Sequence, residues 1–122
     1  MALSNATILI VEDDPLVRRL LAILVKDLVG CEPLEAADGQ VALDLLHTRS
    51  VDLVISDLLM PRLSGFEVLS AMRQTPSLAK IPFILISSDH QATLDLKPQV
   101  EAVLLKPFSI TAVMQTVDGL LG

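Results

Sequence analysis

Side chains capable of chemistry stand at or directly after the ends of four short apolar runs in this chain of 122 residues. They are Glu12, Asp13 and Asp14, then Asp57, then Ser87, and finally Lys106. Adjacent carboxylates repel one another unless a proton or a cation neutralises them. Carboxylate oxygens with room for water suit Mg²⁺, which binds one or two carboxylates together with phosphate oxygens. The acidic triplet therefore predicts a magnesium site.

Phosphoryl transfer is the chemistry that this set of side chains favours. A carboxylate can act as a nucleophile and form an aspartyl phosphate. The transfer needs positioning, a metal ion and positive charge on the transferring oxygens. Asp57 as the nucleophile, Mg²⁺ on Glu12 and Asp13, and Lys106 and Ser87 on the phosphoryl oxygens would form a complete set, provided that the fold brings them together.

The elements that must position these residues follow from the apolar pattern, in which short runs alternate with segments of helical spacing. The runs are TILIV (7–11), CEPLEA (31–36), VDLVIS (51–56), PFILIS (82–87) and VEAVLL (100–105). The helical spacing is carried by Val17, Leu20, Leu21, Leu24 and Leu28, by Val41, Ala42, Leu45 and Leu46, by Phe66, Leu69 and Met72, and by Ile110, Val113, Met114, Val117 and Leu121.

Five strands that alternate with helices predict an α/β fold, a parallel sheet with helices on both faces. The second run contains Pro33 and fits an edge strand. Right-handed crossovers favour the flavodoxin-like, doubly wound order 2-1-3-4-5. In that order the strand order reverses between strands 1 and 3, and ligands bind at the carboxyl ends of the strands there. Glu12, Asp57 and Lys106 should then share one edge of the sheet.

Capping residues mark where three helices begin. Asp14 before Pro15 provides an N-cap followed by proline at the first helical position. Ser64 and Glu67 have the spacing of a capping box, and Ser109 is placed to cap the last helix.

Composition narrows the class of protein to a single compact domain over residues 1–122. The net charge is −6, so a direct nucleic-acid ligand is not expected. No apolar run approaches the ~20 residues that span a membrane, and the N-terminus lacks the pattern of a secretory signal. The single cysteine, Cys31, excludes an internal disulfide, reads as a small core residue and fits a cytoplasmic location.

Taken together, the sequence resembles the receiver domain of two-component response regulators, of the chemotaxis-regulator-like kind, over essentially the whole chain. DLLMP and LLKPF are specific to this family at their strand ends, whereas an acidic pair alone would not be. The matching segments are ILIVEDDP, AADGQVAL, VDLVISDLLMPRLSGFEVL, IPFILISS and LLKPF.

The resemblance implies a role for each residue. Asp57 takes the place of the phosphoacceptor, Ser87 that of the switch hydroxyl and Lys106 that of the family's lysine, with a cis bond to Pro107. Gly65 falls in the turn before the third helix. The implied ligands of Mg²⁺ are Glu12, Asp13, Asp57 and the backbone carbonyl of Leu59, with Asp13 the more direct of the acidic pair.

The resemblance also implies partners. A sensor histidine kinase or phosphotransfer protein would donate the phosphoryl group to Asp57. The response would be binding of an unknown downstream protein, homodimerisation, or control of an output domain in a longer chain. The domain is not expected to be an enzyme, apart from slow loss of its own phosphoryl group, nor to bind a membrane. Leu59 and Asp89 stand where the family tunes that loss: an apolar Leu59 cannot orient an attacking water, which would slow the loss, whereas Asp89 could position water and oppose this.

Two departures from the family keep a second interpretation open. The usual aromatic residue three positions before the lysine is Val103, and the segment from Ser87 to Lys106 is about one helical turn short and contains Pro98. The fourth helix should therefore be short or irregular. A phosphorylation-independent interaction module is the alternative. A phosphatase with an aspartyl-phosphate intermediate is disfavoured, because Leu59 replaces its second aspartate.

The remaining polar residues are expected to be structural. His47 and His90 have no ligand-like neighbours in the sequence and are not predicted to bind a metal. Arginines 18, 19, 62 and 73 are interpreted as solvated charges.

Overall fold

The alternation of strands and helices predicted from the sequence is present in the structure. A computed structural model describes residues 5–60 and 62–121, without the side chains at positions 90, 92 and 97; Pro61 of the DLLMP motif lies outside the described residues. The elements in chain order are β1 (Thr7–Val11), α1 (Pro15–Ile23), the π-helix η2 (Leu24–Val29), β2 (Glu32–Ala36), α2 (Gly39–Thr48), β3 (Leu53–Asp57), α3 (Gly65–Gln74), β4 (Phe83–Ser87), α4 (His90–Leu96), the 3₁₀ helix η3 (Lys97–Gln99), β5 (Ala102–Leu105) and α5 (Ile110–Leu121).

The sheet confirms the predicted topology. Its five strands are all parallel, in the order β2-β1-β3-β4-β5. β2, which contains Pro33, lies at an edge, where a residue without a backbone N–H is tolerated. The third and fifth strands begin two residues later than the apolar runs that predicted them, at Leu53 and Ala102, because pairing rather than hydropathy sets their ends.

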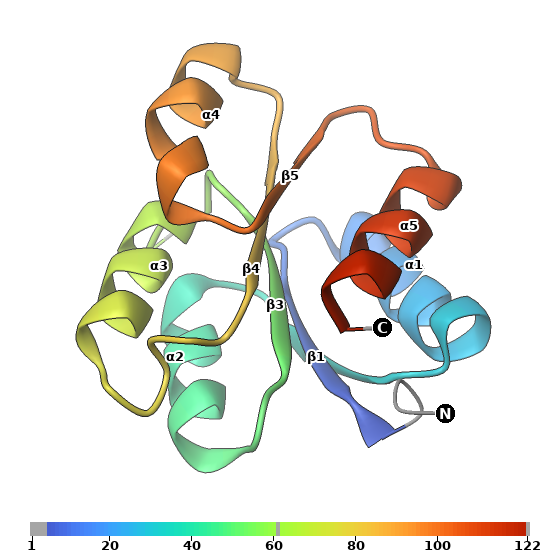
Figure 1. Cartoon of the computed structure of the whole chain (residues 1–122), viewed down its shortest axis with the longest axis horizontal. Coiled ribbons are helices and arrows are strands. Elements are labelled where there is room, and N and C mark those ends of the chain that lie inside the picture. The colour runs from blue at the N-terminus through green and yellow to red at the C-terminus, as the bar shows by residue number, and fades with distance from the viewer. Residues whose placement is uncertain (1–4, 61, 122) are drawn as a thin grey trace.

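Helices cover both faces of the sheet, as Figure 1 shows, with α1 and α5 on one side and α2, α3 and α4 on the other. Side chains alternate along each strand, so that Ile8 and Ile10 pack toward α1 and α5. Leu9 and Val11 pack toward α2 and α3 in a second core. Strands buried on both faces explain the nearly unbroken apolar runs of the sequence.

The predicted helix caps are all present. Asp14 Oδ1 accepts hydrogen bonds from the backbone of the first turn of α1, the shorter from Leu16 N at 2.9 Å. Ser64 and Glu67 form the reciprocal capping box of α3, which begins at Gly65 itself. Ser109 Oγ accepts from Ala112 N at 3.0 Å at the start of α5.

The helix after β1 changes its hydrogen-bond register part of the way along. It continues from α1 into the six-residue π-helix η2, which ends where Gly30 takes a left-handed conformation at φ 85°. Leu21 and Val25 face the core, but Leu20 and Leu28 are 46% and 52% exposed. The expectation that Leu20 and Leu28 share the apolar face of this helix is therefore wrong; for Leu28 the reason is the wider turn of η2, which rotates it away from the sheet.

The segment between β4 and β5 is short, as predicted from its length and Pro98. α4 has seven residues and gives way to η3, which contains that proline. Val103 of β5 is partly buried and packs against the core on the α2 and α3 face. Within the described residues, no helix is both long enough and apolar enough to cross a membrane.

Candidate functional site

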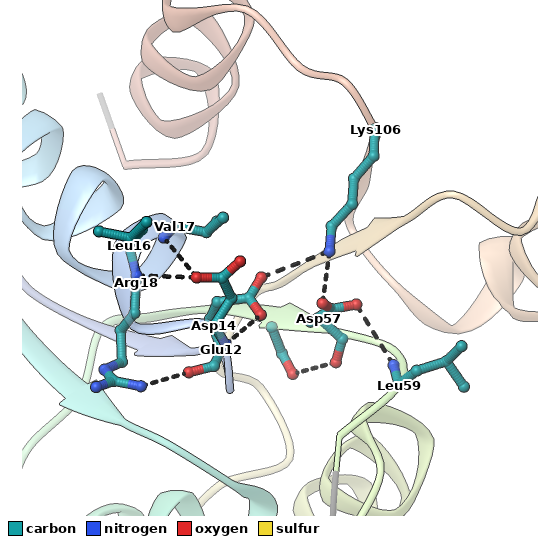
Figure 2. Close-up of polar contacts among 9 residues, drawn as sticks. Glu12, Asp14, Leu16, Val17, Arg18, Asp57, Leu59 and Lys106 are labelled. Carbon is teal, nitrogen blue, oxygen red and sulfur yellow. Dashed lines mark hydrogen bonds and ion pairs between the residues drawn. The ribbon is translucent and has the colours of Figure 1, made fainter.

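Three charged side chains meet where the strand order reverses. Glu12 follows β1, Asp57 is the last residue of β3, and Lys106 follows β5. Figure 2 shows the lysine reaching down between the two carboxylates. The parallel register brings the ends of β1 and β3 side by side, which is why residues 45 positions apart in the chain become neighbours.

Asp57 and Lys106 form the tightest contact of the site. Lys106 Nζ donates a hydrogen bond to Asp57 Oδ2 at 2.6 Å, and the carboxylate is buried. Partial burial lowers the pKa of Lys106, but the hydrogen bond and the negative charge of Asp57, helped by Glu12, outweigh it and raise the pKa above its ordinary value. The lysine is therefore a permanent cation beside Asp57.

Glu12 is a buried carboxyl group with too few partners. Its side chain is 1% exposed, and its Oε2 accepts a hydrogen bond from Asp14 N at 3.1 Å. Its Oε1 lies 3.6 Å from Lys106 Nζ and accepts no hydrogen bond from any described residue. Burial, followed by the nearby charge of Asp57, raises the pKa of Glu12 to about 7, although the Asp14 amide and Lys106 oppose the shift.

These acids have the arrangement that a divalent cation needs. Carboxylate oxygens of Glu12, Asp13 and Asp57 all lie within 4.8 Å of one another, with Asp13 exposed and the other two buried. Glu12 Oε1, which accepts no hydrogen bond from the described residues, and the charge of Asp57 share one cation, Lys106, so a second cation would stabilise the buried pair. The donor set consists of oxygen atoms only and opens to water at Asp13, so it fits Mg²⁺.

The loop after β3 packs tightly against Asp57. Leu59 N lies 3.4 Å from Asp57 Oδ1, at the limit of a hydrogen bond, while the Leu59 side chain is 69% exposed. Gly65 N donates to Leu58 O at 2.8 Å and closes the loop. A Cβ on Gly65 would lie only 2.2 Å from the Asp57 carbonyl oxygen, so glycine is required at this position by space rather than by its φ angle.

Ser87 lies at the end of β4, the strand beside Asp57, but its hydroxyl group is turned toward its own loop. Ser87 Oγ accepts a hydrogen bond from Asp89 N at 2.9 Å. The backbone oxygen of Asp89 accepts from Thr93 Oγ1 at 2.7 Å and from Thr93 N at 3.0 Å, so the loop is tied to α4. The peptide bond between Lys106 and Pro107 is cis, as predicted.

The interpretation of the arginines as solvated charges is wrong for two of them. Arg18 donates to the carbonyl oxygen of Glu12 at 2.9 Å and pairs with Glu35, so it fastens the acidic segment to β2. Arg73 reaches three backbone carbonyls and Glu101, and so joins α3 to the chain before β4 and β5. These contacts could not be predicted from the sequence, because backbone carbonyls carry no sequence signal and the carboxylates of Glu35 and Glu101 lie 17 and 28 positions away.

Asp38 and Arg62 form a further pair beside the site. Arg62 Nε donates to Asp38 Oδ2 at 3.1 Å, and Asp38 Oδ1 accepts from Val41 N at 3.0 Å as the N-cap of α2. The Val41 amide, together with Arg62, holds the pKa of the Asp38 carboxyl below its usual value. Sequence reasoning treated Arg62 as a solvated charge and did not identify this pair.

Comparison with known proteins gives a consistent result. The chain is 29% identical to the chemotaxis protein CheY of Pseudomonas aeruginosa, over 91% of this chain and 92% of that protein. It is 33% identical to a gliding motility regulatory protein of Myxococcus xanthus, covering 98% of this chain but only 16% of the length of that protein. The structure of CheY4 of Vibrio cholerae superposes with a TM-score of 0.88 at 28% identity, over 96% of this chain and 99% of that one.

The family model of the response regulator receiver domain matches residues 8–118, which include every residue of the site described above. Receiver domains are signalling modules of two-component systems. The chain belongs to the response regulator receiver domain family, with the flavodoxin-like fold of the CheY-like proteins.

Proposed function

We propose that this chain is a phosphoacceptor whose Asp57 receives a phosphoryl group in the presence of Mg²⁺ and thereby alters the binding of a partner. The observation that carries the proposal is the buried Asp57 carboxylate, held by Lys106 at 2.6 Å beside Glu12 Oε1, which accepts no hydrogen bond from the described residues. Membership of the receiver family supports it. The proposed donor is a cytoplasmic histidine kinase or phosphotransfer protein.

In the proposed reaction, an oxygen of Asp57 attacks the phosphorus of a phosphohistidine. A P–O bond forms and the P–N bond breaks, and the electron pair of that bond returns to the imidazole nitrogen, which takes up a proton. Lys106 holds the Asp57 carboxylate in place and supplies positive charge to the phosphoryl oxygens. Mg²⁺, bound by Glu12, Asp13, Asp57 and the Leu59 carbonyl, would neutralise the charge that gathers there.

The proposed response begins at Ser87. Its hydroxyl group would leave Asp89 N and donate to a phosphoryl oxygen, because a charged acceptor makes the stronger hydrogen bond. Since the Asp89 carbonyl accepts a hydrogen bond from Thr93, a movement of this loop would also displace α4. Partner binding, dimerisation or release of an attached output domain would follow from this population shift.

The proposal is tested by intact mass after incubation with acetyl phosphate, with and without Mg²⁺. Mass is the appropriate readout because the chain has no Trp and no Tyr. We expect one phosphoryl adduct that depends on Mg²⁺, is lost in Asp57→Asn and is retained in Asp27→Asn, which removes an exposed carboxylate from η2. An adduct that persists at full stoichiometry in Asp57→Asn would exclude this residue as the acceptor.

The second candidate function is an interaction module that works without phosphorylation. It is favoured by the seven-residue α4 and by Val103, which leaves no aromatic side chain at that position to respond to Ser87. Partner affinity that is the same with and without a phosphoryl group on Asp57 would support this alternative. A change in that affinity, lost in Ser87→Ala, would exclude it.

A further inference from the structure

Arg62 has an unusual backbone conformation for its residue type. Its φ of 66° makes it the one non-glycine residue with a positive φ in the described part of the chain. Long side chains rarely adopt this conformation, which persists where the surroundings determine it. Arg62 lies in the β3–α3 loop, described here at residues 58–60 and 62–64, which connects Asp57 to α3.

The surroundings that determine this conformation belong to α2. Arg62 donates to Asp38 Oδ2 through both Nε and Nη2, while the Asp38 side chain is only 13% exposed. The other oxygen of Asp38 caps α2 through Val41 N, so the carboxylate is fixed before it meets the arginine. At the same place, a Cβ on Gly39 would lie 2.5 Å from Leu63 Cβ and Leu63 O, so the loop rests directly on the first turn of α2.

The other end of the same loop rests on Asp57. Gly65 touches the Asp57 carbonyl and bonds to Leu58 O, and Leu59 N approaches Asp57 Oδ1. The loop is thus held between α2 on one side and the site on the other. A displacement at Arg62 would therefore move the backbone of Leu59, which faces Asp57.

We propose that the Asp38–Arg62 pair is a latch that holds the β3–α3 loop against Asp57, and that Arg62 is a positioning residue for metal binding at this site. The part concerning metal rests on the proposed function, since Leu59 would offer its carbonyl oxygen to Mg²⁺. The latch acts through the loop and not through the charge of either residue.

The two explanations, long-range charge and a latch, predict different signs for the change in Mg²⁺ affinity. If only long-range charge mattered, removing the positive Arg62 would strengthen Mg²⁺ binding, and removing the negative Asp38 would weaken it. If the pair is a latch, both changes release the loop and both weaken binding. Charge effects at a distance are also screened at high salt, whereas a change in loop position is not.

The experiment uses Arg62→Asn and Asp38→Asn. Asparagine tolerates a positive φ at position 62 and retains the N-cap at position 38. Arg19→Gln is the matched control, because it removes another exposed arginine from an ion pair, with Glu35 at 3.2 Å. Binding is measured by calorimetric titration with Mg²⁺ alone at low and high salt, and amide exchange of Gly65 is measured in the metal-free protein.

We expect the Mg²⁺ dissociation constant to rise about two- to fivefold in each variant, which corresponds to the stabilisation that an exposed ion pair contributes. Exchange at Gly65 should accelerate by a similar factor, and the double variant should match the singles, because both remove one interaction. The latch would be overturned if the two variants changed the Mg²⁺ dissociation constant in opposite directions, or if their effects added in the double variant. It would also be overturned if the amide of Gly65 exchanged no faster in these variants than in Arg19→Gln. If the parent chain binds no Mg²⁺, the proposed function fails, while exchange at Gly65 still decides the latch.

Discussion

Glu12 should make the metal-free protein less stable as the pH rises through neutrality. Its pKa is about 7 in the folded protein, against an ordinary value of 4.5 that applies to the unfolded chain. Between these values the folded state binds a proton that the unfolded state has released. The stability that this proton contributes is fully present below about pH 4.5 and is lost as the pH rises through about 7.

The size of the effect follows from the two pKa values. Their difference corresponds to about 3 kcal/mol in the free energy of unfolding, most of which falls between about pH 5 and about pH 8. Glu12→Gln should lack this contribution, because the amide is neutral throughout. Gln has nearly the shape of the protonated acid, and its carbonyl oxygen can still accept the hydrogen bond from Asp14 N.

Urea unfolding of both proteins in EDTA, followed by far-ultraviolet circular dichroism across this pH range, measures the difference. The free energy of unfolding of the parent should fall by roughly 2–3 kcal/mol relative to that of Glu12→Gln. The profile of Glu32→Gln, on the exposed edge of β2, should run parallel to that of the parent. Excess Mg²⁺ should flatten the parent profile, since a bound cation favours the carboxylate. Parallel profiles for the parent and Glu12→Gln would refute the reasoning.

Three further predictions concern the same site. Gly65→Ala should lower the free energy of unfolding by about 2 kcal/mol or more, because the new Cβ would lie 2.2 Å from Asp57 O. Gly119→Ala, with open space around it, should instead stabilise α5 by up to about 1 kcal/mol, and equal unfolding midpoints for the two variants would contradict this. Lys106→Met should tighten Mg²⁺ binding several-fold, by about 1 kcal/mol, because it removes a competing cation from Asp57, and weaker binding in a calorimetric titration would argue against that competition. Leu59→Asn should shorten the lifetime of the phosphoryl group about fivefold, the worth of one neutral hydrogen bond to an attacking water, and an unchanged decay followed by mass would exclude that role for the side chain.

The architecture of this chain was predictable because it depends on local signals that agree with one another. Apolar runs of strand length, proline at the second strand and caps at Asp14, Ser64 and Ser109 each indicate the same alternation. Parallel sheets leave few orders to choose from, so the meeting of Glu12, Asp57 and Lys106 followed from topology.

The features that sequence reasoning missed depend on geometry that no local signal records. The π-helix after α1 differs from an α-helix only in which carbonyl each N–H reaches, and Leu28 looks like a core residue in either case. The carboxylates that Arg18 and Arg62 reach lie 17 and 24 positions away, and a long flexible side chain gives no indication in the sequence of which carboxylate it will reach.

The pairing of distant strand ends has a consequence for when the site comes into existence. Glu12, Asp57 and Lys106 come from β1, β3 and β5, so no hairpin, helix pair or half of the chain contains them all. Contacts of such large sequence separation form late and together, after the cost of closing the long loops has been met. A nascent or partly unfolded chain therefore has no assembled cluster of these three side chains, and whatever binds there would distinguish folded molecules from incompletely folded ones.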